Sequence, residues 1–271
     1  MLVDTHTHLL DERLLPRVDK IISNFEKDGL VFAVEVGTGF DDSKNALELA
    51  NKYQRLFCTI GVHPHYAGEY SDEFEEWAKQ VVQKERKIIG VGECGLDYHY
   101  DFSPRDVQRE TFIRQIKLAD TLGLPLVVHS RDAFEDTIQV LTQYKELLKN
   151  GLLLHCFGYG ASEAKKFTGL DAYFAFGGAI TYRDMEMYAS ALKTVPLDRI
   201  VLETDCPYLV PCPIRNGKSE DARVNQPKNI KAVAEYISKI LNMDYTQVCK
   251  ITTENAKRLF KIDAASVRLL T

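Results

Sequence analysis

Short apolar runs alternate with longer stretches of helical periodicity along the whole chain. Most of these runs are continuously apolar, as is typical of strands buried on both faces of a parallel sheet. The pattern predicts eight strands, at Leu2–Thr5, Val31–Val36, Phe57–Val62, Ile88–Gly92, Leu126–Val128, Leu152–Leu154, Tyr173–Phe176 and Ile200–Glu203. Because helical segments fill the gaps between them, the pattern indicates repeated strand–helix units.

The clearest helix signal lies between the fourth and fifth strands. We expect Ser103 to cap this helix, with Pro104 at its first position and Gly123 at its end. After the eighth strand, a segment that contains proline and glycine leads into two more predicted helices, at Lys228–Leu241 and Tyr245–Phe260. No repeat or linker divides the sequence, so we expect a single domain over residues 1–271.

Eight such units are compatible with a closed barrel or with an open, doubly wound sheet. Two observations favour the barrel. The candidate functional residues follow different strands at their carboxyl ends, where barrel active sites lie. A dinucleotide-binding sheet would carry a glycine fingerprint after its first strand, whereas this chain has Thr5-His6-Thr7-His8 there. We therefore expect a (β/α)₈ TIM barrel with additional C-terminal helices.

Ionisable side chains gather at the predicted strand ends. Six of the seven histidines follow the first, third, fifth and sixth strands: His6, His8, His63, His65, His129 and His155. Because side chains alternate along a strand, His6 and His8 share a face and can chelate a single ion. Glu93 after the fourth strand and Asp205 after the eighth add two carboxylates to the same rim.

Each of these residues also has an ordinary structural explanation. A lone histidine is often a hydrogen-bonded core residue, Glu93 can pair with a base, and Asp205 can cap a turn before Pro207. Taken together, however, they would bury uncompensated charges at a cost of roughly several kcal/mol each, which a cation removes. We therefore predict a divalent metal site, with Glu93 bridging two ions because the ligands exceed the needs of one.

The ligand types leave the metal open. Imidazole suits zinc or iron, carboxylate suits magnesium or manganese, and the predicted set mixes them. Its lack of cysteine argues against a purely structural zinc site. We therefore expect a catalytic site that holds two ions of Mg²⁺, Mn²⁺ or Zn²⁺ per chain.

Composition narrows the class of protein. The net charge of −5 provides no global attraction to nucleic acid or anionic membranes, so a phosphate-bearing substrate must be recruited locally. The six cysteines form no CxxC pair, which indicates reduced thiols. Neither a signal peptide nor a membrane span is evident. These features predict a soluble cytoplasmic protein that has no membrane contact and no obligate protein partner.

Seven ordered motifs together resemble the TatD family of metal-dependent deoxyribonucleases, within the amidohydrolase-like barrels. The resemblance runs from Asp4 to about Phe260. Its motifs are Asp4-Thr5-His6-Thr7-His8, Gly61-Val62-His63-Pro64-His65, Gly92-Glu93-Cys94-Gly95-Leu96-Asp97-Tyr98, His129-Ser130-Arg131-Asp132-Ala133, His155-Cys156-Phe157-Gly158, Glu203-Thr204-Asp205-Cys206-Pro207-Tyr208-Leu209 and Glu254-Asn255-Ala256-Lys257-Arg258-Leu259-Phe260.

The resemblance implies a residue for each role in phosphodiester cleavage by a metal-activated water. One ion would be held by His6, His8, Glu93 and Asp205, and the second by Glu93, His129 and His155. His63 would contact a substrate phosphate, with His65 beside it. Asp205 is our candidate to orient the water and accept its proton, so the expected catalytic residues are Glu93, Asp205 and His63.

One segment departs from the family pattern Arg-Gly-Lys-Arg-Asn-x-Pro. Here Arg215-Asn216-Gly217-Lys218 is separated by four residues from Arg223-Val224-Asn225-Gln226-Pro227, which leaves the substrate contacts open. The expected phosphate contacts are Arg131, Arg183, Arg215, Lys218 and Arg223, and the expected base-stacking residues are Tyr66, Tyr98, Phe157, Tyr182 and Tyr208. We expect DNA or another nucleic acid as substrate, with single-stranded or frayed ends preferred to intact duplex.

Two other functions fit parts of the pattern. A small-molecule amidohydrolase or lactonase would use the same barrel, but many of these enzymes bridge their metals with a carbamylated lysine where this chain has Glu93. A non-catalytic metal-binding protein has no need for an open rim of six ligands plus His63. Both alternatives rank below the nuclease.

Overall fold

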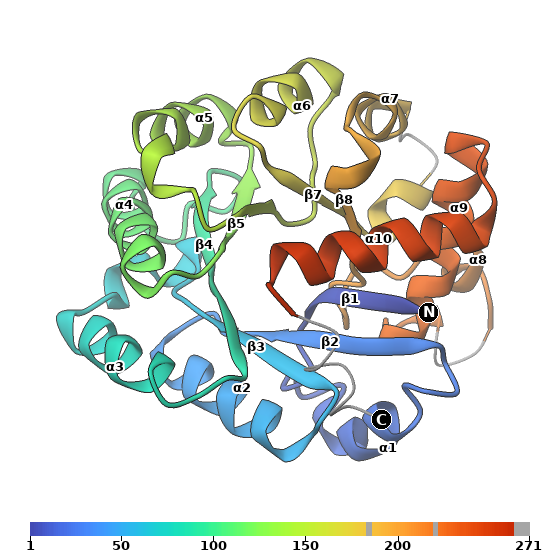
Figure 1. The fold of residues 1–271 in the computed structure, drawn as a ribbon, viewed down its shortest axis with the longest axis horizontal. Helices are drawn as coiled ribbons and strands as arrows, with labels where there is room; N and C mark the ends of the chain where they lie inside the picture. Colours follow the sequence, from blue (N-terminus) through green and yellow to red (C-terminus); the bar gives the residue numbers. More distant parts are fainter. Residues whose placement is uncertain (183–185, 219–221, 263–271) are drawn as a thin grey trace.

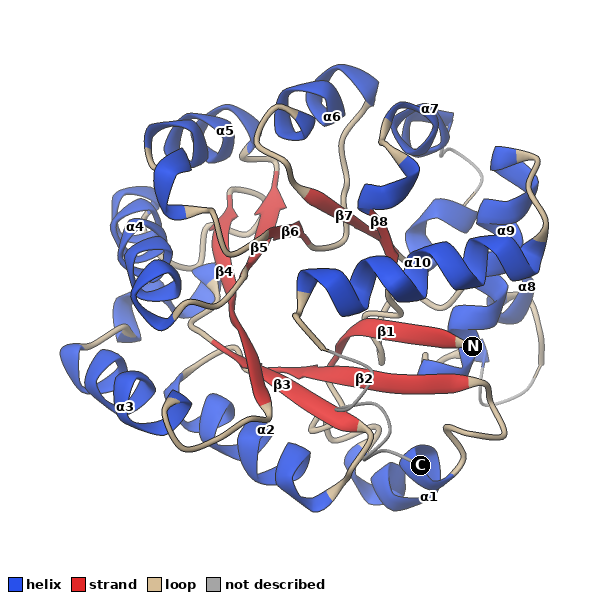
Figure 2. Ribbon diagram, viewed as in Figure 1, coloured by secondary structure: helices blue, strands red, loops and turns tan. Residues whose placement is uncertain are grey.

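The computed structural model describes residues 1–182, 186–218 and 222–262. Eight parallel strands follow one another in sequence order around a barrel, with helices on the outside (Figures 1 and 2). The strands are β1 (Leu2–Thr7), β2 (Leu30–Val36), β3 (Leu56–Ile60), β4 (Ile88–Asp97), β5 (Leu126–Arg131), β6 (Leu152–Leu154), β7 (Tyr173–Phe176) and β8 (Ile200–Leu202). This arrangement confirms the predicted (β/α)₈ fold.

Backbone hydrogen bonds between β1 and the segment after β8 close the barrel. The amide of Asp205 donates to the carbonyl oxygen of His6 at 3.0 Å, and the amide of His8 donates to that of Cys206 at 2.8 Å. Closure therefore occurs at the predicted metal ligands, because His6, His8 and Asp205 belong to the joined segments.

Ten α-helices are described, and most of them cover the outside of the barrel. They are α1 (Val18–Ser23), α2 (Phe40–Lys52), α3 (Asp72–Val82), α4 (Arg105–Leu122), α5 (Phe134–Gln143), α6 (Ala161–Thr168), α7 (Glu186–Thr194), α8 (Cys212–Arg215), α9 (Ile230–Leu241) and α10 (Tyr245–Leu259). Short 3₁₀ helices lie at Leu15–Arg17, Pro64–Glu69, Lys145–Leu147, Gly178–Thr181, Leu197–Arg199 and Pro227–Asn229. No helix in these ranges is long and apolar enough to cross a membrane.

Most predicted element boundaries lie close to the observed ones. Gly123 follows α4 in the left-handed conformation, with φ of 68°, as its predicted role as helix terminator requires. The prediction that Ser103 caps α4 is wrong. Pro104 occupies the cap position, and the Ser103 hydroxyl instead donates to the carbonyl oxygen of His65 at 2.9 Å.

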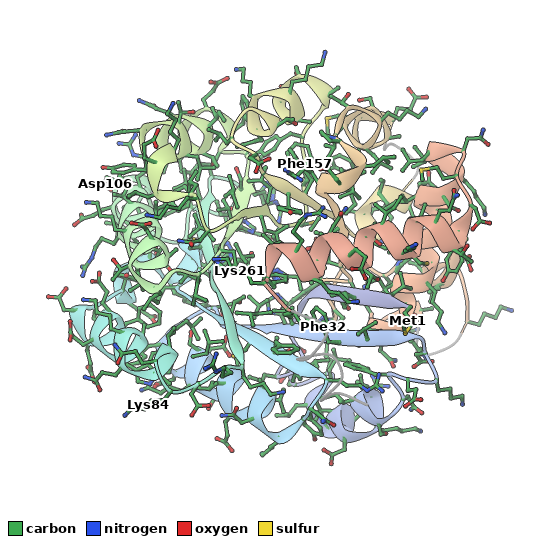
Figure 3. The ribbon with its side chains drawn as sticks, in the orientation of Figure 1. Met1, Phe32, Lys84, Asp106, Phe157 and Lys261 are labelled. Carbon is green, nitrogen blue, oxygen red and sulfur yellow. The ribbon has the colours of Figure 1, made fainter. Side chains whose placement is uncertain are left out.

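Two apolar layers support the barrel. Side chains from the strands and helices pack in the outer layer, whereas an inner cluster fills the barrel at the end away from the predicted metal site. In the inner cluster, Leu259 and Phe260 at the end of α10 pack with strand residues such as Val3 and Phe32. Figure 1 shows α10 crossing this end of the barrel, and Figure 3 labels Phe32 beneath it.

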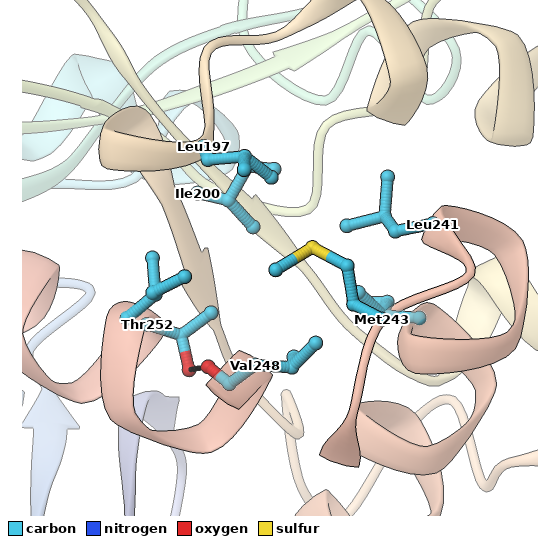
Figure 4. Close-up of a pocket in the computed structure, with 8 residues that line it drawn as sticks. Leu197, Ile200, Leu241, Met243, Val248 and Thr252 are labelled. Carbon is cyan, nitrogen blue, oxygen red and sulfur yellow. Dashed lines mark hydrogen bonds between the residues drawn. The ribbon is translucent and has the colours of Figure 1, made fainter. Parts of the chain in front are cut away.

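A small apolar void lies where α9 and α10 meet β8 (Figure 4). Its volume is about 10 Å³, and Ile200, Leu241 and Met243 are among its lining side chains. A space of this size is at the lower limit for a single water molecule, so it is a packing defect and not a ligand site.

Candidate metal centre

A cavity of about 1130 Å³ opens at the carboxyl ends of the strands. The predicted site residues that line it are His8, His63, His65, Glu93, His129, Arg131, His155 and Asp205. His6 lies deeper, with none of its surface exposed. The structure therefore brings all six predicted metal ligands to one end of the barrel.

Glu93 is the centre of this group. Its Oε2 lies 3.3 Å from Nε2 of His6. Its Oε1 lies 2.9 Å from Nδ1 of His129, 3.6 Å from Nε2 of His63 and 3.7 Å from Nε2 of His155. The two carboxylate oxygens thus face different histidines, which is the arrangement that a bridging ligand requires.

His6 and His8, at the end of β1, and Asp205, in the segment after β8, lie on the Oε2 side of Glu93. Nε2 of His6 and Nε2 of His8 are 3.2 Å apart. Oδ1 of Asp205 lies 3.3 Å from the His8 nitrogen and 3.9 Å from the His6 nitrogen. Two imidazole nitrogens and two carboxylates therefore converge on one point, as the first predicted ion would require.

The Oε1 side offers two further histidines. The ligand atoms of His63, Glu93 and His129 all lie within 4.8 Å of one another. His155, which we expected to complete this second group, lies almost as close to Oε1 as His63 does and also approaches Asp205 at 3.9 Å. The assignment of His155 to the second ion stays a prediction.

Two buried carboxylates hold the outer nitrogens of these histidines. Oε2 of Glu203 lies 2.8 Å from Nδ1 of His155, and Oδ2 of Asp97 lies 3.0 Å from Nε2 of His129. Partners of this kind fix the orientation of histidine ligands in metal sites. The sequence-based prediction gives neither carboxylate a role. The available signal was strand alternation, which places Asp97 on the face of Glu93 and Glu203 on that of Asp205.

The site favours positive charge. Burial alone would lower the pKa of His155, but the carboxylates of Glu203, Glu93 and Asp205 raise it to about 10. His8 behaves in the same way: its bond to Asp205 outweighs burial and raises its pKa to about 9. Burial would raise the pKa of Glu93, yet the surrounding histidines hold it well below its usual range.

This chemistry fits bound divalent ions. Nitrogen and carboxylate oxygen are suitable ligands for zinc, manganese or magnesium. Within the described part of the chain, every ion pair of Glu93 is with a histidine. Nδ1 of His6 is buried and lacks a hydrogen-bond partner. A cation that replaces protons on these imidazoles would relieve the crowding of ligand atoms at the centre.

The predicted phosphate contacts separate into two sets. His65 and Arg131 line the cavity wall. Arg215 is exposed and does not line the cavity, and its guanidinium carbon lies 5.2 Å from the ring centre of Tyr182. Arg223 is exposed and does not line the cavity. Arg183 lies outside the described residues, so its predicted role stays untested.

The predicted stacking residues also divide. Tyr66, Tyr182 and Tyr208 line the cavity, whereas Tyr98 and Phe157 do not. Phe157 is buried and packs edge-on against Phe174 and Phe167, and the Tyr98 hydroxyl donates to Asp136. A base-stacking role for Phe157 and Tyr98 is therefore wrong, because both side chains pack into the protein and away from the cavity.

Comparison with known proteins extends these findings. Residues 3–261 match the family described as TatD related DNase. The metal-dependent hydrolase YabD of Bacillus subtilis is 36% identical over 97% of this chain and all of its own length. The 3'-5' ssDNA/RNA exonuclease TatD of Cronobacter sakazakii is 30% identical over 91% of this chain and 93% of its own.

Solved structures show the same fold. The TatD homologue YjjV of Escherichia coli superposes with a TM-score of 0.88 at 24% identity, over 97% of this chain and 98% of its own. A TatD family hydrolase from Entamoeba histolytica gives a TM-score of 0.84 at 23% identity, over 95% and 97%. Fold and relatives together define a metal-dependent hydrolase built on a (β/α)₈ barrel. The chain belongs to the TatD related DNase family.

Proposed function

We propose that this hydrolase cleaves phosphodiester bonds in nucleic acid and prefers single-stranded or frayed ends. The observation that carries the proposal is the open cavity above Glu93, where four histidines surround one buried carboxylate. A relative that is named as an exonuclease on ssDNA and RNA supports the choice of substrate.

The proposed ligands of one ion are His6, His8, Glu93 and Asp205, and those of the other are Glu93, His129 and His155. Bound ions would activate water and neutralise charge on the phosphate. Asp205 is suited to accept a proton. Its side chain is 13% exposed, against 4% for Glu93, and its interaction with histidines outweighs burial and lowers its pKa, so it is ionised.

His63 is placed to meet the substrate. Its side chain is 10% exposed and lines the cavity, and burial holds its pKa well below the usual value. A neutral imidazole at this position can accept or donate a hydrogen bond at a phosphate oxygen. Arg131, on the same cavity wall, adds a positive charge for a neighbouring phosphate.

Substrate assays test the proposal. Purified protein, stripped with chelator and reloaded with Mg²⁺, Mn²⁺ or Zn²⁺, is incubated with labelled single-stranded DNA, RNA, the annealed blunt duplex and a chromogenic ester. We expect metal-dependent cleavage of single strands at a higher initial rate than of the duplex. Turnover of the ester alone would refute the nuclease and favour a small-molecule hydrolase.

A pair of variants distinguishes the contribution of the metal centre to turnover from that of the rest of the cavity wall. Glu93→Gln removes the shared carboxylate, so we expect turnover to fall to background while the barrel stays folded. Asp132→Asn is the matched control, because Asp132 lines the cavity but pairs with His99 and has no contact with the ligands. Near-normal turnover by Glu93→Gln would show that Glu93 is only structural.

A further inference from the structure

Two aromatic side chains beside the metal centre lie outside the hydrophobic core. Tyr100 is 48% exposed and Phe102 is 68% exposed, and both line the cavity. Their rings stack at a centroid distance of 5.2 Å with an interplanar angle of 21°. Tyr98, which precedes them, packs against the core, whereas these two rings do not. An exposed apolar surface on a cavity wall marks a contact site for a ligand.

His65 connects this aromatic pair to the metal centre. Its ring centre lies 4.8 Å from that of Phe102 and 5.4 Å from that of Tyr100. On its other side it lies 4.3 Å from the ring centre of His63, whose Nε2 approaches Glu93. Only the rings of His65 and His63 therefore separate the exposed rings from Glu93. A substrate whose phosphate reaches the metal centre can therefore place its adjoining base over this part of the wall.

Hydrogen bonds at both ends fix the segment that carries the pair. Oδ1 of Asp97 accepts the amide of Tyr100 at 2.9 Å, and Oδ2 of the same carboxylate faces His65 at 3.1 Å. At the other end, the Ser103 hydroxyl donates to the carbonyl oxygen of His65 at 2.9 Å. The rings are thus positioned before a ligand arrives, which lowers the ordering cost of binding.

The rings form the end of a stack. The guanidinium carbon of Arg131 lies 5.0 Å from the ring centre of Tyr100, and Tyr100 stacks on Phe102. Phe102 is 68% exposed and lines the cavity, so its ring offers exposed surface on which a further flat group can be added. Arg131 adds positive charge on the same wall, which suits a ligand that combines a flat ring with a phosphate.

We propose that Phe102, backed by Tyr100, stacks an unpaired nucleobase of the strand whose phosphodiester lies at the metal centre. This inference rests on the proposed nuclease function and names its base-binding subsite. Stacking on an aromatic ring tolerates any base but requires that the base be unpaired. The subsite therefore selects single strands and frayed ends without selecting sequence.

Abasic substrates test the subsite directly. The metal-loaded protein is assayed on single-stranded oligonucleotides that carry all their bases, or one abasic residue at successive positions from the cleaved end. We expect removal of one particular base to lower kcat/KM of the wild-type protein by about 5- to 150-fold, the range for a single stack. Phe102→Ala should show the same loss on the complete oligonucleotide and no further loss on the abasic one.

Conservative variants separate stacking from apolar contact. Phe102→Tyr keeps the ring and should retain the discrimination against the abasic residue, whereas Phe102→Leu keeps only apolar character and should behave like Phe102→Ala. Leu197→Ala is the control, because it removes a side chain that is 43% exposed and that does not line the cavity.

The outcomes distinguish the subsite from the activity. If the wild-type protein cleaves single strands but Phe102→Ala still discriminates against the abasic residue, the subsite is overturned and the nuclease function stands. If Phe102→Leu retains full discrimination, the contact is apolar and not a stack, and the inference is again overturned. If no nucleic acid is cleaved and only the ester reacts, the proposed function fails and the nucleobase subsite fails with it.

Discussion

Glu203 shows how a buried carboxylate can orient a histidine that we propose as a metal ligand. Its carboxylate lies 2.8 Å from Nδ1 of His155 and accepts the amide of Cys156 at the same distance. A proton held on Nδ1 leaves Nε2 to face Glu93 and Asp205. The side chain is fully buried, so the orientation that it imposes on His155 is not disturbed by solvent.

Removing the charge of Glu203 should weaken metal binding, because its carboxylate orients His155. Glu203→Gln keeps the shape of the side chain but removes its charge, and we expect the affinity for the more weakly held ion to fall by about 10- to 100-fold. Titration calorimetry on the chelator-stripped protein measures the change, with Asp132→Asn as the control at the cavity mouth. Unchanged affinity would show that His155 is oriented by its packing alone.

Among the elements, β4 and β5 approach each other closely beside the site. Gly95 has φ of 133°, and a Cβ placed there would overlap the carbonyl oxygen of His129. Both the backbone conformation and the lack of space require glycine. The contact keeps the two strands close together, which positions the His129 imidazole beside Glu93.

Replacing this glycine should therefore affect both the fold and the site. We expect Gly95→Ala to lower the free energy of unfolding by at least about 1–3 kcal/mol, the cost of a strained backbone, measured by denaturant titration of the metal-free protein. Gly39→Ala is the control, since Gly39 has extended backbone with nothing within 4 Å of the added atom. Equal stability of the two variants would contradict this view of the β4–β5 contact.

The sequence predicted the elements well where apolar runs define them. The predicted bounds of β6 and β7 agree with the structure, because both strands consist entirely of apolar or aromatic residues. The predictions for β1, β4 and β5 ended early, because polar residues such as His6, Glu93 and His129 interrupt the apolar runs while the backbones continue the parallel ladder.

The prediction of the site was less complete than that of the fold. Alternation and strand ends located the ionisable side chains that meet at one end of the barrel, since both depend only on position along the strand. The orientation of Phe157 and the exposure of Phe102 depend on contacts with distant segments, which periodicity does not report. For the same reason the sequence did not reveal that Ser103 bonds to His65 and leaves the helix cap to Pro104.

At the scale of the whole molecule, the two ends of the barrel have different roles. The end covered by α10 is apolar and contributes packing. The other end gathers ionisable groups from β1, β4, β5, β6 and the segment after β8, which meet only because the barrel closes between His8 and Cys206. Because the net charge is −5, our proposal requires bound cations to attract a phosphate group to this end.

The number and place of bound ions test this account most directly. Crystals soaked with excess Mn²⁺ or Zn²⁺ are measured at the absorption edge of the metal, and anomalous difference density is calculated around Glu93. We predict two separate peaks per chain, one beside Oε2 near His6 and His8, and one beside Oε1 near His129. A single peak at every metal concentration, or peaks away from Glu93, would contradict the shared-carboxylate centre.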